Sequence, residues 1–119
     1  HRIRMTNTFK DLIVWQKSKQ LAVEIYKLTE SFPKSELYGL VNQMRRAVIS
    51  ISSNIAEGYK RFHSKEKKQF FSVASGSGTE LESQIEIAKE LFPKIDFSRS
   101  ILLLEEIMKI LNNFVKKLS

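Results

Sequence analysis

Apolar residues recur every three or four positions along most of the chain, which is the spacing of amphipathic α-helices. The pattern predicts four helices, over about residues 11–31, 36–60, 64–92 and 98–118. Both prolines, Pro33 and Pro93, fall between these stretches, where they are expected to end helices. Four such helices joined by short connections predict an all-α fold, an antiparallel up-down-up-down four-helix bundle.

Polar residues at the predicted helix starts are candidate caps, because their side chains accept hydrogen bonds from unpaired backbone amides. Asp11 is expected to cap the first helix or to lie in its first turn. Ser35 is the expected cap of the second helix. Asp96 or Ser98 is the expected cap of the fourth.

The second predicted helix has an ordinary apolar face and an unusual polar one. The apolar face consists of Met44, Val48, Ile51 and Ile55, and the polar face of Gln43, Arg46, Ser50, Asn54, Glu57 and Arg61. Ser50 and Asn54 are short and compete for backbone hydrogen bonds, so they favour a helix less than long charged residues do. We therefore expect this face to pack closely against another helix or subunit. Gly58 is either a terminator or a site of close contact.

The middle of the third predicted helix contains Gly76 and Gly78 among small polar residues. Each glycine costs a helix about 1 kcal/mol relative to alanine. We nevertheless predict an unbroken helix, because the apolar spacing continues from Ala74 to Leu81. Small residues at this point allow close approach by the short residues of the second helix. The candidate residues for helix or subunit packing are Ser50, Asn54, Glu57, Gly76, Ser77 and Glu80.

The fourth predicted helix carries two apolar rows. They are Ile101, Leu104, Met108, Leu111, Val115 and Leu118 in one row, and Leu103, Ile107, Ile110 and Phe114 in the other. One row suffices to close a four-helix core, so the second row predicts burial by another subunit. The alternative is a broad core face within a single small bundle.

The 119 residues are 42% hydrophobic, which is typical of one globular domain. We place this domain at residues 9–119, after an N-terminal tail of residues 1–8; residues 1–4 precede Met5 and are a candidate expression remnant. The absence of cysteine excludes disulfides and thiolate metal sites and fits the reducing cytoplasm. No stretch approaches the roughly twenty apolar residues that cross a bilayer, so we expect a soluble protein without a membrane partner.

The formal net charge is +7, and the excess is local. Between residues 43 and 68, seven basic residues stand against two acidic ones. Such a cluster attracts polyanions such as RNA, DNA or anionic lipid; the alternative is a solvated helix end that only keeps the protein soluble. The candidate nucleic-acid-binding residues are Arg45, Arg46, Lys60, Arg61, Lys65, Lys67 and Lys68. Arg45 and Arg46 are alternatively structural.

Residues that commonly carry catalysis are few. A di-iron bundle needs Glu-x-x-His pairs, whereas Lys60 lies three residues before His63. His63 is an acid–base group for RNA cleavage, a phosphate contact or simply exposed. Glu57 and Glu80 either face each other or are compensated by nearby arginine, serine or asparagine side chains. We expect no catalytic residue, no metal and no cofactor.

Four ordered motifs carry a family resemblance. They are Phe9-Lys10-Asp11-Leu12-x-Val14-Trp15-Gln16, Phe32-Pro33-x-x-Glu36-x-Tyr38-Gly39-Leu40, Gln43-x-Arg45-Arg46-Ala47 with Asn54-Ile55-Ala56-Glu57-Gly58, and Gly76-Ser77-x-x-Glu80-Leu81-Glu82. From Phe9 to about Leu91 the chain resembles the 23S rRNA intervening-sequence protein family, also called four-helix bundle proteins. The resemblance implies a small bacterial protein that assembles into a homopentameric barrel. It also implies a relation to the accessory protein of diversity-generating retroelements, a basic pentamer implicated in binding nucleic acid and a reverse transcriptase.

These features predict a non-enzymatic, cytoplasmic homo-oligomer, a pentamer if the resemblance holds, that binds RNA or DNA through its basic residues. One alternative is a scaffold that docks a protein partner, with the basic residues only solubilising. The other is an enzyme that cleaves RNA by means of His63.

Overall fold

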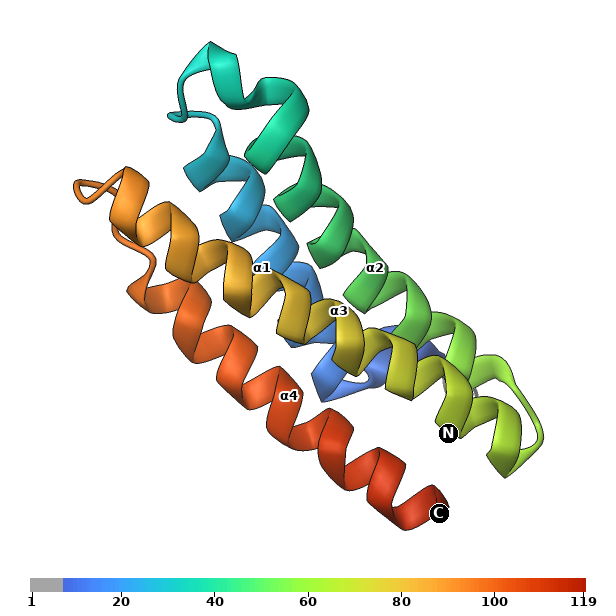
Figure 1. Ribbon diagram of the computed structural model, residues 1–119. Coiled ribbons are helices and arrows are strands. Elements are labelled where there is room, and N and C mark those ends of the chain that lie inside the picture. The colour runs from blue at the N-terminus through green and yellow to red at the C-terminus, as the bar shows by residue number, and fades with distance from the viewer. Residues whose placement is uncertain (1–7) are drawn as a thin grey trace, which may run out of the picture.

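The computed structural model describes residues 8–119, and in this range the chain forms helices and no strands (Figure 1). The elements are the 3-10 turn η1 (Phe9–Asp11), α1 (Ile13–Thr29), the 3-10 turn η2 (Lys34–Glu36), the π-helical turn η3 (Leu37–Val41), α2 (Asn42–Lys60), α3 (Ser64–Leu91) and α4 (Ser98–Leu118). α1 and α3 each pack against both α2 and α4, and consecutive helices run in opposite directions. The predicted four-helix bundle is confirmed. The candidate remnant, residues 1–4, lies outside the described residues.

The core lies along the bundle axis, where the apolar stripes of all four helices meet. The stripe predicted for α2 is confirmed, since Met44, Val48, Ile51 and Ile55 are each 0% exposed. Burying a side chain of this size contributes about 1.5–3 kcal/mol relative to leaving it exposed. Within residues 8–119, none of the helices is both long enough and apolar enough to pass through a membrane.

The beginning of α2 differs from the prediction. Ser35 lies inside η2 and does not cap α2. The carboxylate of Glu36 instead accepts a hydrogen bond from the Leu40 amide at 3.4 Å. Gly39 has non-helical backbone angles (φ −107°, ψ −107°), so the chain passes through the π-helical turn before regular α-helix begins at Asn42. Apolar spacing alone does not distinguish this turn from an α-helical one.

The caps predicted for the first and fourth helices are wrong. The N-cap residues are Leu12 for α1 and Phe97 for α4, and neither has a polar side chain that could accept a cap hydrogen bond. Asp11 instead belongs to the capping box of η1. Thr8 is the cap, its hydroxyl accepts a hydrogen bond from the Lys10 amide, and the Asp11 carboxylate accepts one from the Thr8 amide. Asp96 accepts a hydrogen bond from the Ser98 amide at 2.9 Å, at the start of α4. Hydrogen bonding from the Ser98 backbone and hydroxyl holds the pKa of Asp96 below its ordinary value.

The predicted continuity of the third helix through residues 75–79 is confirmed. Gly78 is buried against α4, where a Cβ atom would collide with the sulfur of Met108. Gly58 is a site of close contact, because α2 continues to Lys60 and a Cβ atom at Gly58 would lie 2.8 Å from Cε1 of Phe71. Gly76 is exposed, and a Cβ atom there would meet nothing within 4 Å.

Both apolar rows of α4 contribute to the core of a single chain. Leu104 and Leu111 of one row are buried, and so are Leu103 and Ile107 of the other. Phe114 is half-buried and packs on the ring of Phe71. The single bundle therefore covers the centre of both rows without a second subunit.

Candidate functional site

The connection between α2 and α3 brings five of the predicted basic residues together. Only residues 61–63 separate the two helices, and the Arg61 amide closes α2 by donating to the Gly58 carbonyl. Phe62 lies at the centre of this connection and is 95% exposed. The basic residues around it are Lys60, Arg61, Lys65, Lys67 and Lys68. The tip of the helical hairpin is therefore an exposed aromatic ring surrounded by cations.

Two of these five cations are engaged by the fold itself. The Lys67 ammonium donates to the carbonyls of Tyr59, at 2.8 Å, and Gly58, at 3.3 Å, so it satisfies the last turn of α2. Arg61 forms an ion pair with Glu57 and lies 4.7 Å from the ring centre of Phe70. Replacing Lys67 or Arg61 with a neutral residue would therefore disturb the structure of the hairpin as well as remove a positive charge.

The other three cations, Lys60, Lys65 and Lys68, have no hydrogen-bond or ion-pair partner among residues 8–119. Lys60 and Lys65 are exposed and Lys68 is half-buried. Their ammonium groups are thus available to an external anion.

Arg45 and Arg46 lie apart from this cluster. They precede Lys60 by about fourteen residues of α2, roughly 21 Å at 1.5 Å per residue. Arg45 donates to the Thr29 hydroxyl at 2.9 Å and to the Tyr26 carbonyl at 3.2 Å, and its guanidinium lies 4.5 Å from the Tyr26 ring centre. Arg45 therefore holds α2 against α1. Arg46 is exposed.

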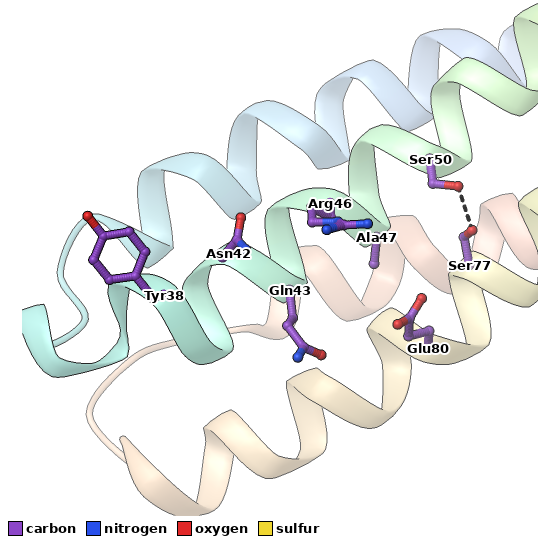
Figure 2. Close-up of a pocket in the computed structure, with 8 residues that line it drawn as sticks. All are labelled: Tyr38, Asn42, Gln43, Arg46, Ala47, Ser50, Ser77 and Glu80. Carbon is purple, nitrogen blue, oxygen red and sulfur yellow. Dashed lines mark hydrogen bonds between the residues drawn. The ribbon is translucent and has the colours of Figure 1, made fainter.

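Arg46 lines a polar groove of about 420 Å³ between α2 and α3 (Figure 2). Its lining residues are Tyr38, Asn42, Gln43, Arg46, Ala47, Ser50, Ser77 and Glu80. Glu80 lies on the α3 side of this groove, whereas Glu57 pairs with Arg61 near the hairpin tip. The two carboxylates therefore do not face each other. Among residues 8–119, no group of three or more His, Cys, Asp or Glu side chains is arranged to hold a metal ion.

The short polar residues of α2 meet the small middle segment of α3, as their size predicts. The hydroxyls of Ser50 and Ser77 lie 2.8 Å apart (Figure 2). Asn54 donates to the carbonyl and the hydroxyl of Ser50, at 2.8 and 3.1 Å. Ser50, Asn54 and Ser77 therefore form the polar part of the α2–α3 contact. Gly76, which is exposed, does not take part in it.

The fold brings further basic residues to the α2–α3 end of the bundle, which the charge pattern of residues 43–68 did not include. The start of α1 and the end of α4 lie at the same end of the bundle as the α2–α3 connection (Figure 1). Segments 8–19, 57–70 and 109–119 together hold eleven basic and three acidic residues, whereas the remaining described segments hold seven basic and ten acidic ones. The exposed lysines that these segments bring to this end are Lys10, before α1, and Lys116 and Lys117, in the last turn of α4, whereas Lys109 lies near the middle of α4. Applying the alternating helix directions to the charge pattern would have found them.

A known protein family matches most of this chain. The family model described as 23S rRNA-intervening sequence protein matches residues 10–113, which include all four helices except residues 114–118 at the end of α4. No curated protein matches the chain. The match extends beyond about Leu91, where the resemblance found in the sequence ended, into α4. The chain therefore belongs to the 23S rRNA-intervening sequence protein family.

Proposed function

We propose that this chain is a homo-oligomeric protein without catalytic activity that binds RNA or DNA at the α2–α3 end of the bundle. The observation that carries the proposal is the group of three unpartnered ammonium groups, Lys60, Lys65 and Lys68, around the exposed ring of Phe62. Cations that neutralise phosphates release condensed counterions, which drives binding. An exposed aromatic ring adds a surface on which a base can stack.

The distribution of charge along the bundle supports the same ligand. The excess of basic residues at the α2–α3 end attracts a polyanion, and the acidic excess elsewhere repels it. A polyanion would therefore approach with one orientation. The family name, which refers to 23S rRNA, supports RNA as one ligand. The relation to the retroelement accessory protein, which the sequence resemblance implies, would favour nucleic acid more generally.

A titration against labelled RNA and DNA oligonucleotides tests this proposal. We expect fluorescence anisotropy to rise on adding the protein near physiological ionic strength, and the affinity to fall steeply as salt increases. No salt-sensitive association with either polymer would contradict the proposal.

We propose that the copies associate through the outer face of α3. Gly76 lies in the middle of this face and is not required by its own bundle, since a Cβ atom there meets nothing within 4 Å. An exposed glycine in a helix costs about 1 kcal/mol, and close approach by a second helix would account for it. Val73, Ile87 and Leu91 lie on the same face and are exposed. Five copies is the number that the family resemblance implies.

Sedimentation velocity tests this association with a matched pair of variants. Val73 on α3 is 47% exposed and Val23 on α1 is 48% exposed. We expect Val73→Glu to dissociate the assembly and Val23→Glu to leave it intact. A wild-type chain that sediments as a monomer at every concentration would contradict the association.

A second candidate function is a scaffold for a protein partner. A groove of about 570 Å³ between α3 and α4 favours it, because its floor is apolar (Ile101, Leu104 and Met108) and its rim carries Glu82 and Glu86. A single protein partner retained in a pull-down after nuclease treatment, by a chain that binds no nucleic acid when purified, would replace the first proposal with this one.

A further inference from the structure

We infer that the nucleic acid bound at the α2–α3 end is single-stranded, and that one of its bases stacks on Phe62. The inference rests on the proposed function and specifies the class of ligand. It starts from the position of Phe62, whose ring is 95% exposed at the tip of a hairpin between two long helices. Because both helices continue into the bundle, they position the backbone at Phe62, and its ring projects into solvent.

The fold does not need Phe62 to close the hairpin. Gly58 of α2 lies directly against Phe70 and Phe71 of α3, which brings the two helices into contact beneath the tip. Phe71 is buried and packs on Phe114 of α4, while Phe70 lies beneath the guanidinium of Arg61. A large apolar ring that contributes nothing to this packing is available to a ligand.

The charges around Phe62 fit a strand that passes over its ring. Lys60 lies two residues before Phe62 and Lys65 three residues after it, on the two helices that flank the tip. Phosphates on either side of a stacked nucleotide would therefore meet an ammonium group. Lys67, held by neutral backbone carbonyls, adds positive potential without leaving its partners, whereas Glu57 offsets the charge of Arg61.

A projecting ring distinguishes single strands from duplexes. In a duplex the faces of the bases are covered by their neighbours, and only their edges are accessible in the grooves. The whole face of an unpaired base is accessible for stacking. Because every base has such a face, stacking favours single strands over duplexes without a strong sequence preference. Charge alone would not give this preference, because a duplex carries more phosphates per unit length than a single strand.

The test compares a single strand with a blunt duplex of the same sequence, as RNA and as DNA, near physiological salt. We expect the wild type to bind the single strand more tightly. Phe62→Leu keeps an apolar side chain but removes the aromatic face. It should weaken single-strand binding about 5- to 150-fold, the range that base–aromatic stacking spans, and leave duplex binding unchanged.

Two further variants serve as controls. Phe62→Trp should retain the single-strand affinity, because the indole also stacks. Tyr38→Leu removes another highly exposed ring, 88% exposed, near the start of α2, away from the tip, and should change neither affinity. Binding confined to single-stranded RNA or to single-stranded DNA would still support the inference and would show whether the site requires ribose or deoxyribose.

Equal binding of single strand and duplex would overturn the inference, and so would Phe62→Leu variants that bind as the wild type does or lose both ligands equally. In those cases the proposed nucleic-acid function would stand. Failure of the wild type to bind any nucleic acid would remove the proposed function as well.

Discussion

Replacing Gly58 and Gly76 with alanine, one at a time, should have opposite effects on stability. At Gly58 the new Cβ atom would lie 2.8 Å from Cε1 and 3.0 Å from Cδ1 of Phe71, and 3.1 Å from Cβ of Phe70. The Phe71 ring is buried and cannot move aside freely, and Cβ of Phe70 is fixed to the backbone. At Gly76 the new atom would meet nothing within 4 Å.

The magnitudes follow from two terms. Alanine stabilises a helix by up to about 1 kcal/mol relative to glycine, with the full gain expected at Gly76, in the middle of α3. Overpacking a close contact costs about 1–3 kcal/mol. In the unassociated chain, Gly76→Ala should therefore raise the unfolding free energy by about 1 kcal/mol, whereas in the proposed assembly the added methyl group would lie at the contact between copies. Gly58→Ala should lower the unfolding free energy by up to about 2 kcal/mol, because the overpacking cost exceeds the gain in helix propensity.

Urea denaturation followed by far-ultraviolet circular dichroism measures both effects. Each variant should be compared with the wild type at several protein concentrations, because self-association would add a concentration-dependent term. At the lowest concentration the two variants should differ by about 1–3 kcal/mol. A Gly58→Ala variant as stable as Gly76→Ala would refute the assignment of Gly58 as a close-contact site.

Three further predictions concern the polar contacts. Arg45→Ala should lower the unfolding free energy by about 1–3 kcal/mol, because it breaks hydrogen bonds of a charged group to α1. Replacing the exposed Arg46 with alanine should change the unfolding free energy by less than about 0.5 kcal/mol. Similar values for the two variants would contradict the structural role of Arg45. Ser50→Ala and Ser77→Ala should each lower the unfolding free energy by about 0.5–1.5 kcal/mol, and a double-mutant cycle should show coupling between the two residues. Fully additive decreases in the unfolding free energy would argue against their hydrogen bond. Because hydrogen bonds from Ser98 lower the folded-state pKa of Asp96, the charged carboxylate stabilises the fold above the unfolded-state pKa and this contribution disappears as the pH falls through the folded-state pKa. The stability difference between the wild type and Asp96→Ala should therefore narrow in acid titration below the ordinary value of 3.8, and a difference that stays constant to pH 2 would contradict this.

The sequence predicted the helices well because their signal is repeated over many turns. The apolar spacing on both sides of Gly76 and Gly78 identified α3 as unbroken despite two poor helix formers. The start of α2 was not predictable in the same way. The π-helical turn and the non-helical backbone of Gly39 change only one turn of helix, and a single turn carries too few apolar positions to reveal a change of period.

The candidate site was predictable where its residues are close in sequence. Lys60 to Lys68 span one connection, so their proximity follows from the chain itself. Which of these cations is free did not follow, because it depends on carbonyl groups and rings that only the folded hairpin brings near Lys67 and Arg61. The contribution of Lys116 and Lys117 required the bundle topology, since about fifty residues separate them from the hairpin tip.

The salt dependence of single-stranded RNA binding by two matched variants tests the central claim most directly. One variant carries Lys60→Gln, Lys65→Gln and Lys68→Gln at the α2–α3 end. The control carries Lys27→Gln, Lys34→Gln and Lys94→Gln, three exposed lysines outside the basic segments of that end. If each lysine at the tip contacts one phosphate, the slope of log K against log salt should become shallower by about 2 in the first variant, at roughly 0.7 per phosphate, and stay unchanged in the control. Equal slopes in the two variants would contradict binding at this end of the bundle.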